Sequence, residues 1–387
     1  MLARDGIPRS RGFLKLGGAV AGALAAVGHW RTLEAVGGSF ENNLRDITVL
    51  IPARNETAVI ERTLAALRSQ GEGFLTILID DQSSDGTVAL AQSLLIPGLT
   101  ILSGSPLPAG WTGKLWALEQ GWRHVKSNFV LLLDADIELE QGVLPALRQK
   151  IEERDLVSVM AHLRMQTFWE RLLAPAFVYF FKLIYPFRLG NDPRSRVAVA
   201  AGGCILLRCT ALQNIGGFEP LRMAIIDDCS LAKKIKETGG RTWTGLSRSV
   251  RSHRPYERLS DFWDMVARTA FTQLRYSVWL LLATTFLMFL GFWMPLIGLS
   301  LLPASAKGFA VIAVMAMMIS YLPTLRYCRR SVFWALALPL ISGFYLLMTW
   351  SSAFRFWQGK RSQWKGRVYP RAAEQPEPRP KKGYRRL

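Results

Sequence analysis

The sequence predicts an α/β fold with a Rossmann-like, mostly parallel sheet, followed by C-terminal transmembrane helices. Residues 47–51 and 75–79 are short apolar runs typical of buried strands, and an amphipathic segment over residues 57–69 lies between them. Strand, helix and strand in this order form a βαβ unit, whose two strands run parallel. A third apolar run, residues 129–133, adds another strand, and the almost wholly apolar stretch 278–354 provides the membrane part.

Each of the three predicted strands ends in a polar turn. The turns are Pro52-Ala-Arg-Asn-Glu56, Asp80-Asp81-Gln-Ser-Ser-Asp85-Gly-Thr87 and Asp134-Ala-Asp136. Because the carboxyl ends of parallel strands share one edge of a sheet, where open α/β sheets bind ligands, we expect the turns to converge. Asp80 or Asp81 could accept hydrogen bonds from a base or a ribose, and Asp85 is expected to cap the next helix.

Asp134 and Asp136 are candidate metal ligands. In an extended chain, residues two apart point to the same side, so we expect their carboxylates to act together. Two neighbouring carboxylates repel each other unless a cation lies between them, and Mg²⁺ or Mn²⁺ carrying a diphosphate is the expected cation. The alternative is a solvated acidic turn, because Glu138 and Glu140 continue the acidic run.

The charge distribution indicates a membrane partner. The 387 residues carry a formal charge of +19, and half of them are hydrophobic. Lys and Arg gather beside or after the apolar stretches, at residues 326–330, 355–371 and 381–386. This arrangement fits an anionic cytoplasmic leaflet better than nucleic acid, so we expect no nucleic-acid partner. The four cysteines have no zinc-ligand spacing, and a reducing compartment is the default.

Residues 1–44 resemble a signal or a short anchor. Arg9, Arg11 and Lys15 precede an apolar run of small residues that ends before His29. A spanning helix needs about 17 to 25 apolar residues, and this run is shorter. We expect an uncleaved N-terminal anchor.

The three polar turns, in their order, resemble the GT-A-fold glycosyltransferases of family 2 over residues 46–276. Trp111-Thr-Gly-Lys114 and the terminal apolar stretches most resemble hopanoid-biosynthesis-associated glycosyltransferases and, more distantly, ceramide glucosyltransferases. The resemblance implies a nucleotide-sugar donor, expected to be a UDP-sugar, and a divalent metal. It implies a nucleotide site lined by Pro52, Asn55, Glu56 and Asp81, with Asp134 on ribose or metal and Asp136 on the metal.

Two further features could serve a phosphate or a sugar. Lys114 precedes an expected helix over residues 115–125, where a lysine and free amide groups could meet an anionic phosphate. A solvated lysine is the alternative. Gly202 and Gly203, in an expected strand over residues 197–208, either permit close backbone approach to a ligand or mark a bulge.

Asp227 and Asp228 open an expected helix that runs to about Thr238. Acidic residues at a helix start often only complement the helix dipole. The family resemblance implies that Asp228 is the general base, and Asp227 stands where Glu is usual. Chemistry agrees, because an alcohol that attacks an anomeric carbon must lose its proton.

The following segment holds candidate acceptor or diphosphate contacts, with Asp227 among them. His253 is a candidate metal ligand by position. Gln273 and Arg275 lie in Thr-Gln-Leu-Arg-Tyr, which matches the family's Gln-x-x-Arg-Trp motif only in part. This departure puts processive polymer synthesis in doubt. The aromatic stretch 168–187 is expected to be an interfacial or acceptor-facing helix, with a core helix as the alternative.

The expected organisation is an N-terminal segment (1–44), a GT-A domain (45–255), an interfacial helix (256–277), transmembrane helices (278–354) and a basic disordered tail (355–387). Stretches 278–302, 308–325 and 331–354 are each about long enough to span. Three spans would place the basic regions 326–330 and 355–371 on opposite faces of the membrane, whereas basic regions favour the cytoplasmic face. One stretch can therefore be re-entrant or interfacial.

The expected function is inverting transfer of a sugar to a lipid hydroxyl, with a hopanoid as the leading acceptor. The expected location is the inner membrane, as a multi-pass protein with its catalytic domain in the cytoplasm. The alternatives are transfer to a polyprenyl phosphate or a ceramide-like lipid, a nucleotidyltransferase, and a non-catalytic membrane scaffold.

Overall fold

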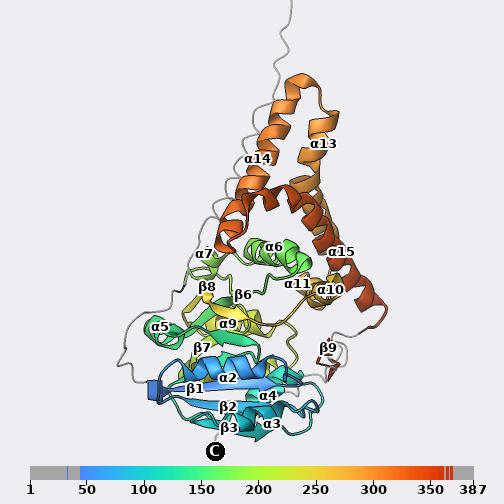
Figure 1. Cartoon of the computed structure of the whole chain (residues 1–387). Helices are drawn as coiled ribbons and strands as arrows, with labels where there is room; N and C mark the ends of the chain where they lie inside the picture. Colours follow the sequence, from blue (N-terminus) through green and yellow to red (C-terminus); the bar gives the residue numbers. More distant parts are fainter. Residues whose placement is uncertain (1–32, 34–43, 361–362, 366, 369–387) are drawn as a thin grey trace, which may run out of the picture.

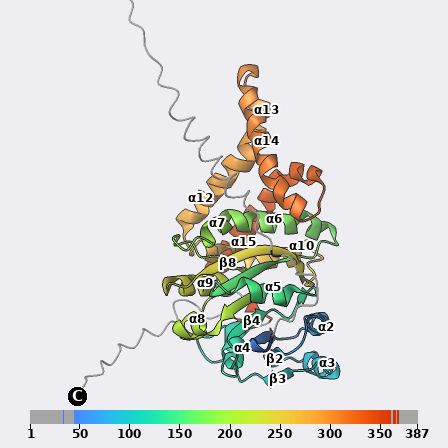
Figure 2. The same ribbon diagram turned by 90° about the vertical axis from the view of Figure 1, so that its left-hand side faces the viewer.

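The computed structural model describes residues 33, 44–360, 363–365 and 367–368. Figure 1 shows three tiers: an α/β domain, a middle layer of helices, and long helices that project away from both. Figure 2 shows the same tiers from the side. Apart from Leu33 and Leu44, the predicted N-terminal anchor lies outside the described residues.

The α/β domain is built on one mixed sheet. Within the described residues it has eight strands in the order β3-β2-β1-β4-β7-β6-β8-β5. The strands are β1 (Ile47–Ala53), β2 (Leu75–Asp80), β3 (Leu99–Ser103), β4 (Phe129–Leu133), β5 (Ile137–Leu139), β6 (Leu156–His162), β7 (Cys204–Arg208) and β8 (Thr242–Ser252). Strands β3, β2, β1 and β4 pair in parallel, as the sequence predicts, whereas β7 runs antiparallel to β4 and to β6. Strands β6 and β8 also pair in parallel, and β5 runs antiparallel to β8. The predicted α/β fold is confirmed, with a mixed sheet whose antiparallel pairs involve β7 and β5.

Alternating apolar residues place helices on both faces of the sheet. In β1, Val49 and Ile51 pack in one core cluster and Leu50 packs in the other. The first cluster is covered by α2 (Ile60–Arg68), α3 (Thr87–Ser93) and α5 (Val143–Lys150). The second is covered by α4 (Gly113–Trp122), α8 (Cys209–Asn214) and α9 (Asp227–Glu237). This burial fixes the ends of β1, β2 and β4 relative to α4 and α9.

Two local predictions in the α/β domain are wrong. Strand β4 ends at Leu133, and residues 134–136 form a turn in which the amide of Ile137 donates to the carbonyl of Asp134 at 3.1 Å. The chain turns here because β5 must pair with β8, so the extended geometry expected for the two aspartates does not apply. The expected strand over residues 197–208 begins only at Cys204.

The middle tier contains α6 (Phe168–Ile184), α7 (Phe187–Gly190), α10 (Leu259–Ala267) and α11 (Ala270–Gln273). Helix α6 begins with a capping box, in which Thr167 and Glu170 accept each other's backbone amides at 3.3 and 3.0 Å. It lies between the sheet and the projecting helices and packs in one apolar cluster with residues of α10, α14 and α15. The single helix expected over residues 259–276 is interrupted between α10 and α11.

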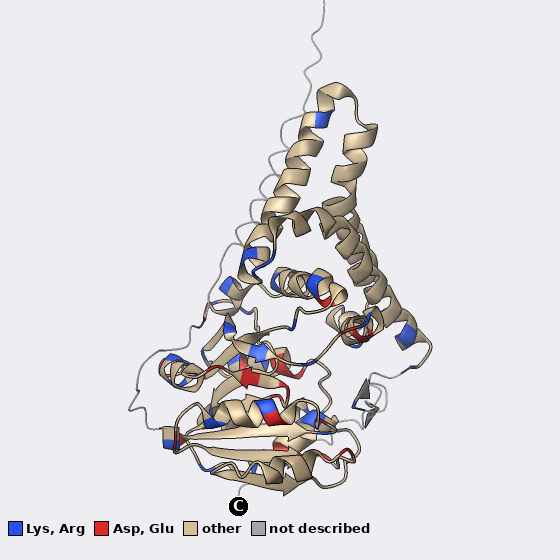
Figure 3. Ribbon diagram, viewed as in Figure 1, with Lys and Arg blue, Asp and Glu red and all other residues tan. Residues whose placement is uncertain are grey.

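Three helical stretches are long and apolar enough to cross a membrane: Val278–Leu301, Ala304–Tyr327 and Val332–Trp357. The first comprises α12 (Val278–Met288), a π-helical turn and α13 (Met294–Leu301), the second is α14 (Ala304–Tyr327), and the third ends in α15 (Leu338–Trp357). Figure 3 shows the projecting parts of these helices almost free of charge, with the charged residues gathered in the tiers below.

Both ends of the third apolar stretch lie beside the α/β domain and its middle tier. At the start, Arg248 of β8 donates to the carbonyl of Tyr327 at 2.8 Å, just before the Arg329-Arg330 loop. At the end, Arg355 pairs with Asp264 of α10 at 2.6 Å. The two basic regions therefore lie on the same side of the apolar helices. This geometry fits the alternative in which one stretch is re-entrant or interfacial.

A short hairpin follows α15. Its strands β9 (Gln363–Trp364) and β10 (Arg367–Val368) pair antiparallel, and its turn residue Lys365 accepts a hydrogen bond from Arg54 Nε at 3.0 Å. The prediction of a disordered tail is wrong for these residues, because contacts with the turn after β1 hold them in place. Residues 369–387 lie outside the described residues.

Candidate functional site

A cavity of about 570 Å³ lies where the carboxyl ends of β1 and β4 face the middle tier. Its volume falls in the range of roughly 300–1,000 Å³ that small-molecule sites occupy. One wall is charged and comes mainly from the α/β domain, and the opposite wall is apolar at α6, whereas α10 contributes Met265 together with Asp261 and Asp264. The predicted site residues in its lining are Pro52, Glu56, Lys114, Asp134, Asp136, Asp227 and Asp228.

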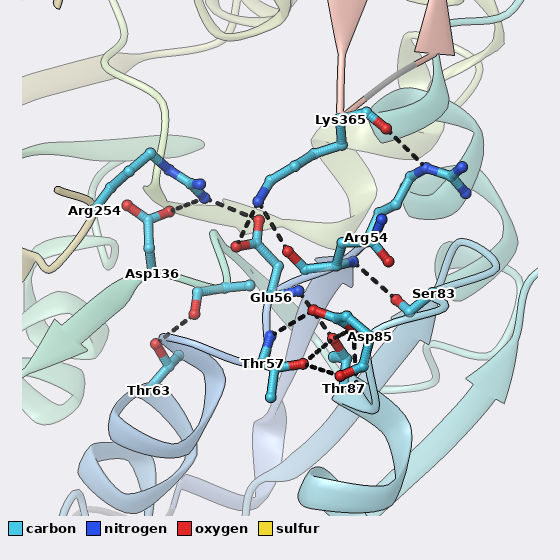
Figure 4. A network of polar contacts seen from close by, with 12 residues as sticks. Arg54, Glu56, Thr57, Thr63, Ser83, Asp85, Thr87, Asp136, Arg254 and Lys365 are labelled. Carbon is cyan, nitrogen blue, oxygen red and sulfur yellow. Dashed lines mark hydrogen bonds and ion pairs between the residues drawn. The ribbon is translucent and has the colours of Figure 1, made fainter. Parts of the chain in front are cut away.

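The first two polar turns converge, as the sequence predicts. Asn55 donates its amide to Ser83 Oγ at 3.0 Å and accepts from the amide of Ser84 at 2.9 Å. Asn55 has a φ of +53°, a conformation that Asn adopts more readily than most residues. Figure 4 shows Ser83 and Asp85 of the second turn beside Glu56 and Thr57 of the first. Asn55 does not line the cavity, so it shapes the turn after β1 instead.

Asp81 also lies behind the cavity wall. Its side chain is 1% exposed, and its amide donates to the carbonyl of Ala53 at 2.8 Å. Arg54 donates to the carbonyl of Asp81 and lies 3.9 Å from its carboxylate. Asp85 accepts from the amides of Thr57 and Thr87, each at 3.1 Å, so it ties both turns together. The predicted N-cap role is wrong, because the N-cap of α3 is Gly86. A direct contact between Asp81 and a nucleotide stays a prediction.

Glu56 is the centre of an ion-pair network on the charged wall. Its carboxylate lies 2.9 Å from Arg254 Nη2 and 3.0 Å from Lys365 Nζ, and it is only 5% exposed. Arg254 also reaches Asp136 at 3.1 Å, and Asp136 accepts from Ser252 Oγ at 2.6 Å (Figure 4). Burial lowers the pKa of Arg254, but the two carboxylates outweigh it and raise that pKa further above its usual value.

Sequence reasoning missed Arg254 and Lys365. Arg254 follows the singled-out His253, and β8 delivers it to the cavity, but the strand was not predicted. Lys365 lies far along the chain in a segment predicted to be disordered, and no spacing links it to Glu56. Only the fold brings these two cations together.

Lys114 lies in the cavity between two carboxylates. Its Nζ is 2.8 Å from Asp134 Oδ1 and 3.2 Å from Asp227 Oδ2. Burial lowers the pKa of Lys114, but Asp134 and Asp227 outweigh that effect and raise it well above its usual range. Lys114 is therefore a fixed positive charge at the start of α4. Its contact with a donor phosphate stays a prediction.

Asp228 lies at the start of α9 and is held by backbone amides. Its Oδ2 accepts from Gly202 at 2.6 Å and its Oδ1 accepts from Cys229 at 2.7 Å. A Cβ at Gly202 would lie 3.3 Å from Asp228 Oδ2, so the glycine permits a close approach to this carboxylate. Burial, and then Asp227, raise the pKa of Asp228 to about 6. Such a carboxylate is ionised at neutral pH and basic enough to take a proton.

The apolar wall of the cavity is formed by helices of the middle tier. Phe177 and Phe181 of α6 and Met265 of α10 line it. Asp261 and Asp264 of α10, and Arg268 after it, also line the cavity, so the apolar surface is provided mainly by α6. Because α6 and α10 also pack against α14 and α15, this wall is continuous with the apolar helices. The prediction that residues 168–187 face the acceptor is consistent with this position.

The structure does not bring the other three candidate contacts to the cavity wall. The ring of His253 faces Glu138 and Arg62, and only its amide is near the site, donating to the carbonyl of Asp136 at 2.9 Å. Gln273 accepts a hydrogen bond from the Tyr185 hydroxyl. Arg275 is exposed, with a φ of +52°.

The acidic residues of the cavity suit a divalent metal. In the described part of the chain, no group of three or more His, Cys, Asp or Glu side chains gathers as a ready-made metal site. Mg²⁺ often needs only one or two carboxylates and takes its other ligands from substrate phosphates and water. Asp134 and Asp136 both line the cavity and have the oxygen ligands that Mg²⁺ and Mn²⁺ prefer. They fit a metal that binds together with a diphosphate.

Comparison with known proteins gives the family of this domain. Residues 48–216 match the model of glycosyl transferase family 2. An undecaprenyl-phosphate 4-deoxy-4-formamido-L-arabinose transferase of Shewanella sediminis is 30% identical over 29% of this chain and 34% of its own length. A 4,4'-diaponeurosporenoate glycosyltransferase of Staphylococcus aureus is 31% identical over 33% of this chain and 35% of its own length. The chain thus spans about a third of the length of these curated relatives.

A solved mannosyltransferase from Pyrobaculum calidifontis, in complex with GDP-Man and Mn²⁺, shares the fold. It superimposes with a TM-score of 0.52 and 18% identity, covering 90% of this chain and 98% of its own. The narrower resemblance to hopanoid-associated enzymes stays a prediction. Residues 48–216 therefore resemble glycosyl transferase family 2, and the chain has the predicted GT-A fold.

Proposed function

We propose that the chain is a membrane-bound inverting glycosyltransferase that moves a sugar from a nucleotide donor to a lipid hydroxyl. The observation that carries this proposal is the position of Asp228 in one cavity with a charged wall and an apolar wall. The family 2 domain supports glycosyl transfer over nucleotidyl transfer and over a non-catalytic scaffold.

In the proposed mechanism, Asp228 takes the proton of the acceptor hydroxyl. The hydroxyl oxygen forms a bond to the anomeric carbon on the face opposite the diphosphate. The bond between that carbon and the diphosphate oxygen breaks, and its electron pair leaves with the diphosphate. The amides of Gly202 and Cys229 hold the carboxylate of Asp228 in one orientation during this transfer. A divalent metal on Asp134 and Asp136 would stabilise the negative charge of the leaving group.

A lipid acceptor is supported by the apolar wall and by the relatives. Tyr345 of α15 donates to the carbonyl of Leu173 in α6 at 2.9 Å, and Tyr179 of α6 bonds Ser320 of α14 at 2.8 Å. The wall is thereby attached to helices that can lie in a membrane. One relative is named for an undecaprenyl-phosphate substrate and the other for diaponeurosporenoate, and both names support an apolar acceptor.

The second candidate function is transfer to a polyprenyl phosphate, which the undecaprenyl-phosphate relative favours. A phosphate oxygen is already ionised at neutral pH and needs no base, whereas Asp228 is placed and tuned to accept a proton. A hydroxyl acceptor, with a hopanoid as the leading example, therefore fits this site better, because only a hydroxyl needs Asp228 as a base. The proposed donor is a UDP-sugar, and a GDP-sugar is the alternative that the mannosyltransferase neighbour suggests.

We place the α/β domain on the cytoplasmic side of the inner membrane. Residues 278–301 and 304–327 would cross outward and back, and residues 332–357 would begin and end at the cytoplasmic surface. Both basic regions then face the anionic leaflet, as the positive-inside rule requires. A chain lacking residues 1–44 should still fractionate with membranes, and its recovery in the soluble fraction would contradict this arrangement.

The test is a transfer assay with membranes that contain the full chain. Labelled UDP-sugars and GDP-sugars are supplied one at a time, and label is followed into the organic extract. We expect one donor to label a lipid in a reaction that Asp228→Asn membranes do not support. The susceptibility of the product to mild acid separates a phosphate-linked sugar from a glycoside on a hydroxyl. Label that stays water-soluble with every donor would contradict the proposal.

A further inference from the structure

Lys365 enters the cavity from the C-terminal hairpin rather than from the α/β domain. Its Nζ lies 3.0 Å from Glu56 Oε2 and also donates to the carbonyl of Asn55 at 3.0 Å. Its own carbonyl accepts from Arg54 Nε at 3.0 Å. Figure 4 shows the side chain reaching from the hairpin toward the turn after β1. All three contacts are with the turn predicted to hold the nucleotide.

The backbone at Lys365 is unusual for a lysine. Its φ is +48°, in the left-handed region that an ordinary L-residue avoids. Backbone strain of this kind gathers at ligand-binding positions. This strained backbone position accompanies an ammonium group that lines the cavity.

The electrostatics of the cavity require cations for an anionic ligand. Its lining includes the acidic residues Glu56, Asp134, Asp136, Asp227, Asp228, Asp261 and Asp264, against the basic residues Lys114, Arg254, Arg268 and Lys365. Lys114 and Arg254 each bridge two carboxylates. Lys365 meets one carboxylate and one carbonyl, which use two of its three N–H donors. The third donor can meet a phosphate oxygen without breaking either contact.

We propose that Lys365, which lies between β9 and β10, is a ligand of the donor diphosphate. This inference rests on the proposed function, because it takes a nucleoside diphosphate as the ligand. It gives a residue beyond the last apolar helix a role in donor binding, and the contacts of Lys365 with the turn after β1 place it there.

The experiment measures binding of UDP and GDP, with uridine and guanosine as phosphate-free probes, to the full chain with Mg²⁺. Lys365→Met keeps the length of the side chain and removes the charge, and Lys365→Arg restores the charge. We expect Lys365→Met to weaken diphosphate binding about tenfold or more and to leave nucleoside binding unchanged. Lys365→Arg should recover most of the loss. Lys360→Met, an exposed lysine in the same connection, is the matched control and should bind as the unaltered chain does.

A double variant separates a phosphate ligand from a partner that only neutralises Glu56. If Lys365 merely offsets that carboxylate, Glu56→Gln combined with Lys365→Met should restore diphosphate affinity. If Lys365 contacts the diphosphate, the loss should persist in the double variant. Three outcomes would overturn the proposal for Lys365 and leave the proposed function intact. They are unchanged affinity in Lys365→Met, equal losses for diphosphate and nucleoside, and restored affinity in the double variant. An unaltered chain that binds neither UDP nor GDP would overturn the proposed function as well.

Discussion

The two walls of the cavity differ in origin as well as in polarity. The charged wall comes from turns at strand ends, and its side chains are held by ion pairs such as Glu56–Arg254 and Asp136–Arg254. The apolar wall comes mainly from α6, which packs against α14 and α15. With the proposed function, a polar donor and an apolar acceptor would enter from different sides. The contrast teaches that the boundary between the α/β domain and the helical tiers is also a boundary in polarity within the cavity.

Two carboxylates of the cavity, Asp136 and Asp228, differ in the groups that surround them. Asp136 pairs with Arg254 at 3.1 Å and accepts a hydrogen bond from Ser252 Oγ at 2.6 Å. Asp228 meets two backbone amides and the neighbouring Asp227, and burial raises its pKa. One carboxylate is suited to hold a cation, and the other to take a proton.

The largest expected effect is that of Asp228→Asn. Asn keeps the shape and much of the capping ability but cannot accept a proton, so only the chemical step should suffer. We expect turnover to fall about 10²- to 10⁴-fold, roughly 3–5 kcal/mol of barrier, with nearly unchanged donor affinity. Transfer rate and nucleotide binding are measured on the same membranes.

Asp227→Asn is the matched control for Asp228. It removes a carboxylate of the same helix start, one that pairs with Lys114, and should be milder in its effect on turnover. Near-normal turnover in Asp228→Asn, or a loss of donor affinity as large as the loss of rate, would remove Asp228 from the mechanism.

Removal of the divalent metal should have the next largest effect. We expect excess chelator to reduce transfer about a hundredfold and Mg²⁺ or Mn²⁺ to restore it, because the leaving diphosphate then regains its counter-charge. Asp136→Asn should cause a similar loss that added metal does not repair. Full turnover in chelator would contradict this prediction. It would show that the chain's own cations, such as Arg254, are enough to stabilise the leaving diphosphate.

The pH dependence of the transfer rate should follow the ionisation of Asp228. Since Asp228 must be ionised to act and its pKa is raised to about 6, the rate should fall as the pH is lowered through 6. At pH 5 it should be about a tenth of the neutral plateau. The measurement is the transfer rate at saturating donor from pH 5 to 8. A plateau that extends down to pH 4.5 would argue for a different base.

The α/β half of the site could be predicted from the sequence because its signals are local. Each polar turn directly follows an apolar strand, and parallel pairing is enough to bring the ends of β1, β2 and β4 together. The pairing of β5 with β8 depends on residues far apart in the sequence. The turn over residues 134–136 and the approach of Arg254 were therefore not predictable from spacing.

In the C-terminal half, the sequence predicts the apolar helices but not the contacts that they make. The composition of residues 278–354 identified three apolar helical stretches, and the middle one is longer in the structure, Ala304–Tyr327, than the expected 308–325. Composition cannot indicate that α15 ends beside the middle tier, because that path depends on contacts such as Arg355–Asp264. A short basic segment after the last helix has the composition of a disordered tail. Only its contact with Glu56 marks Lys365 as part of the site.

The most direct test of the division into two walls is a crossed kinetic measurement on Lys114→Met and Phe177→Ala. Apparent KM values for donor and for lipid acceptor are determined for both variants in the same membranes. Lys114→Met should raise the donor KM about tenfold and leave the acceptor KM unchanged, and Phe177→Ala should do the reverse. Both KM values rising by the same factor in either variant would contradict the assignment of one wall to each substrate.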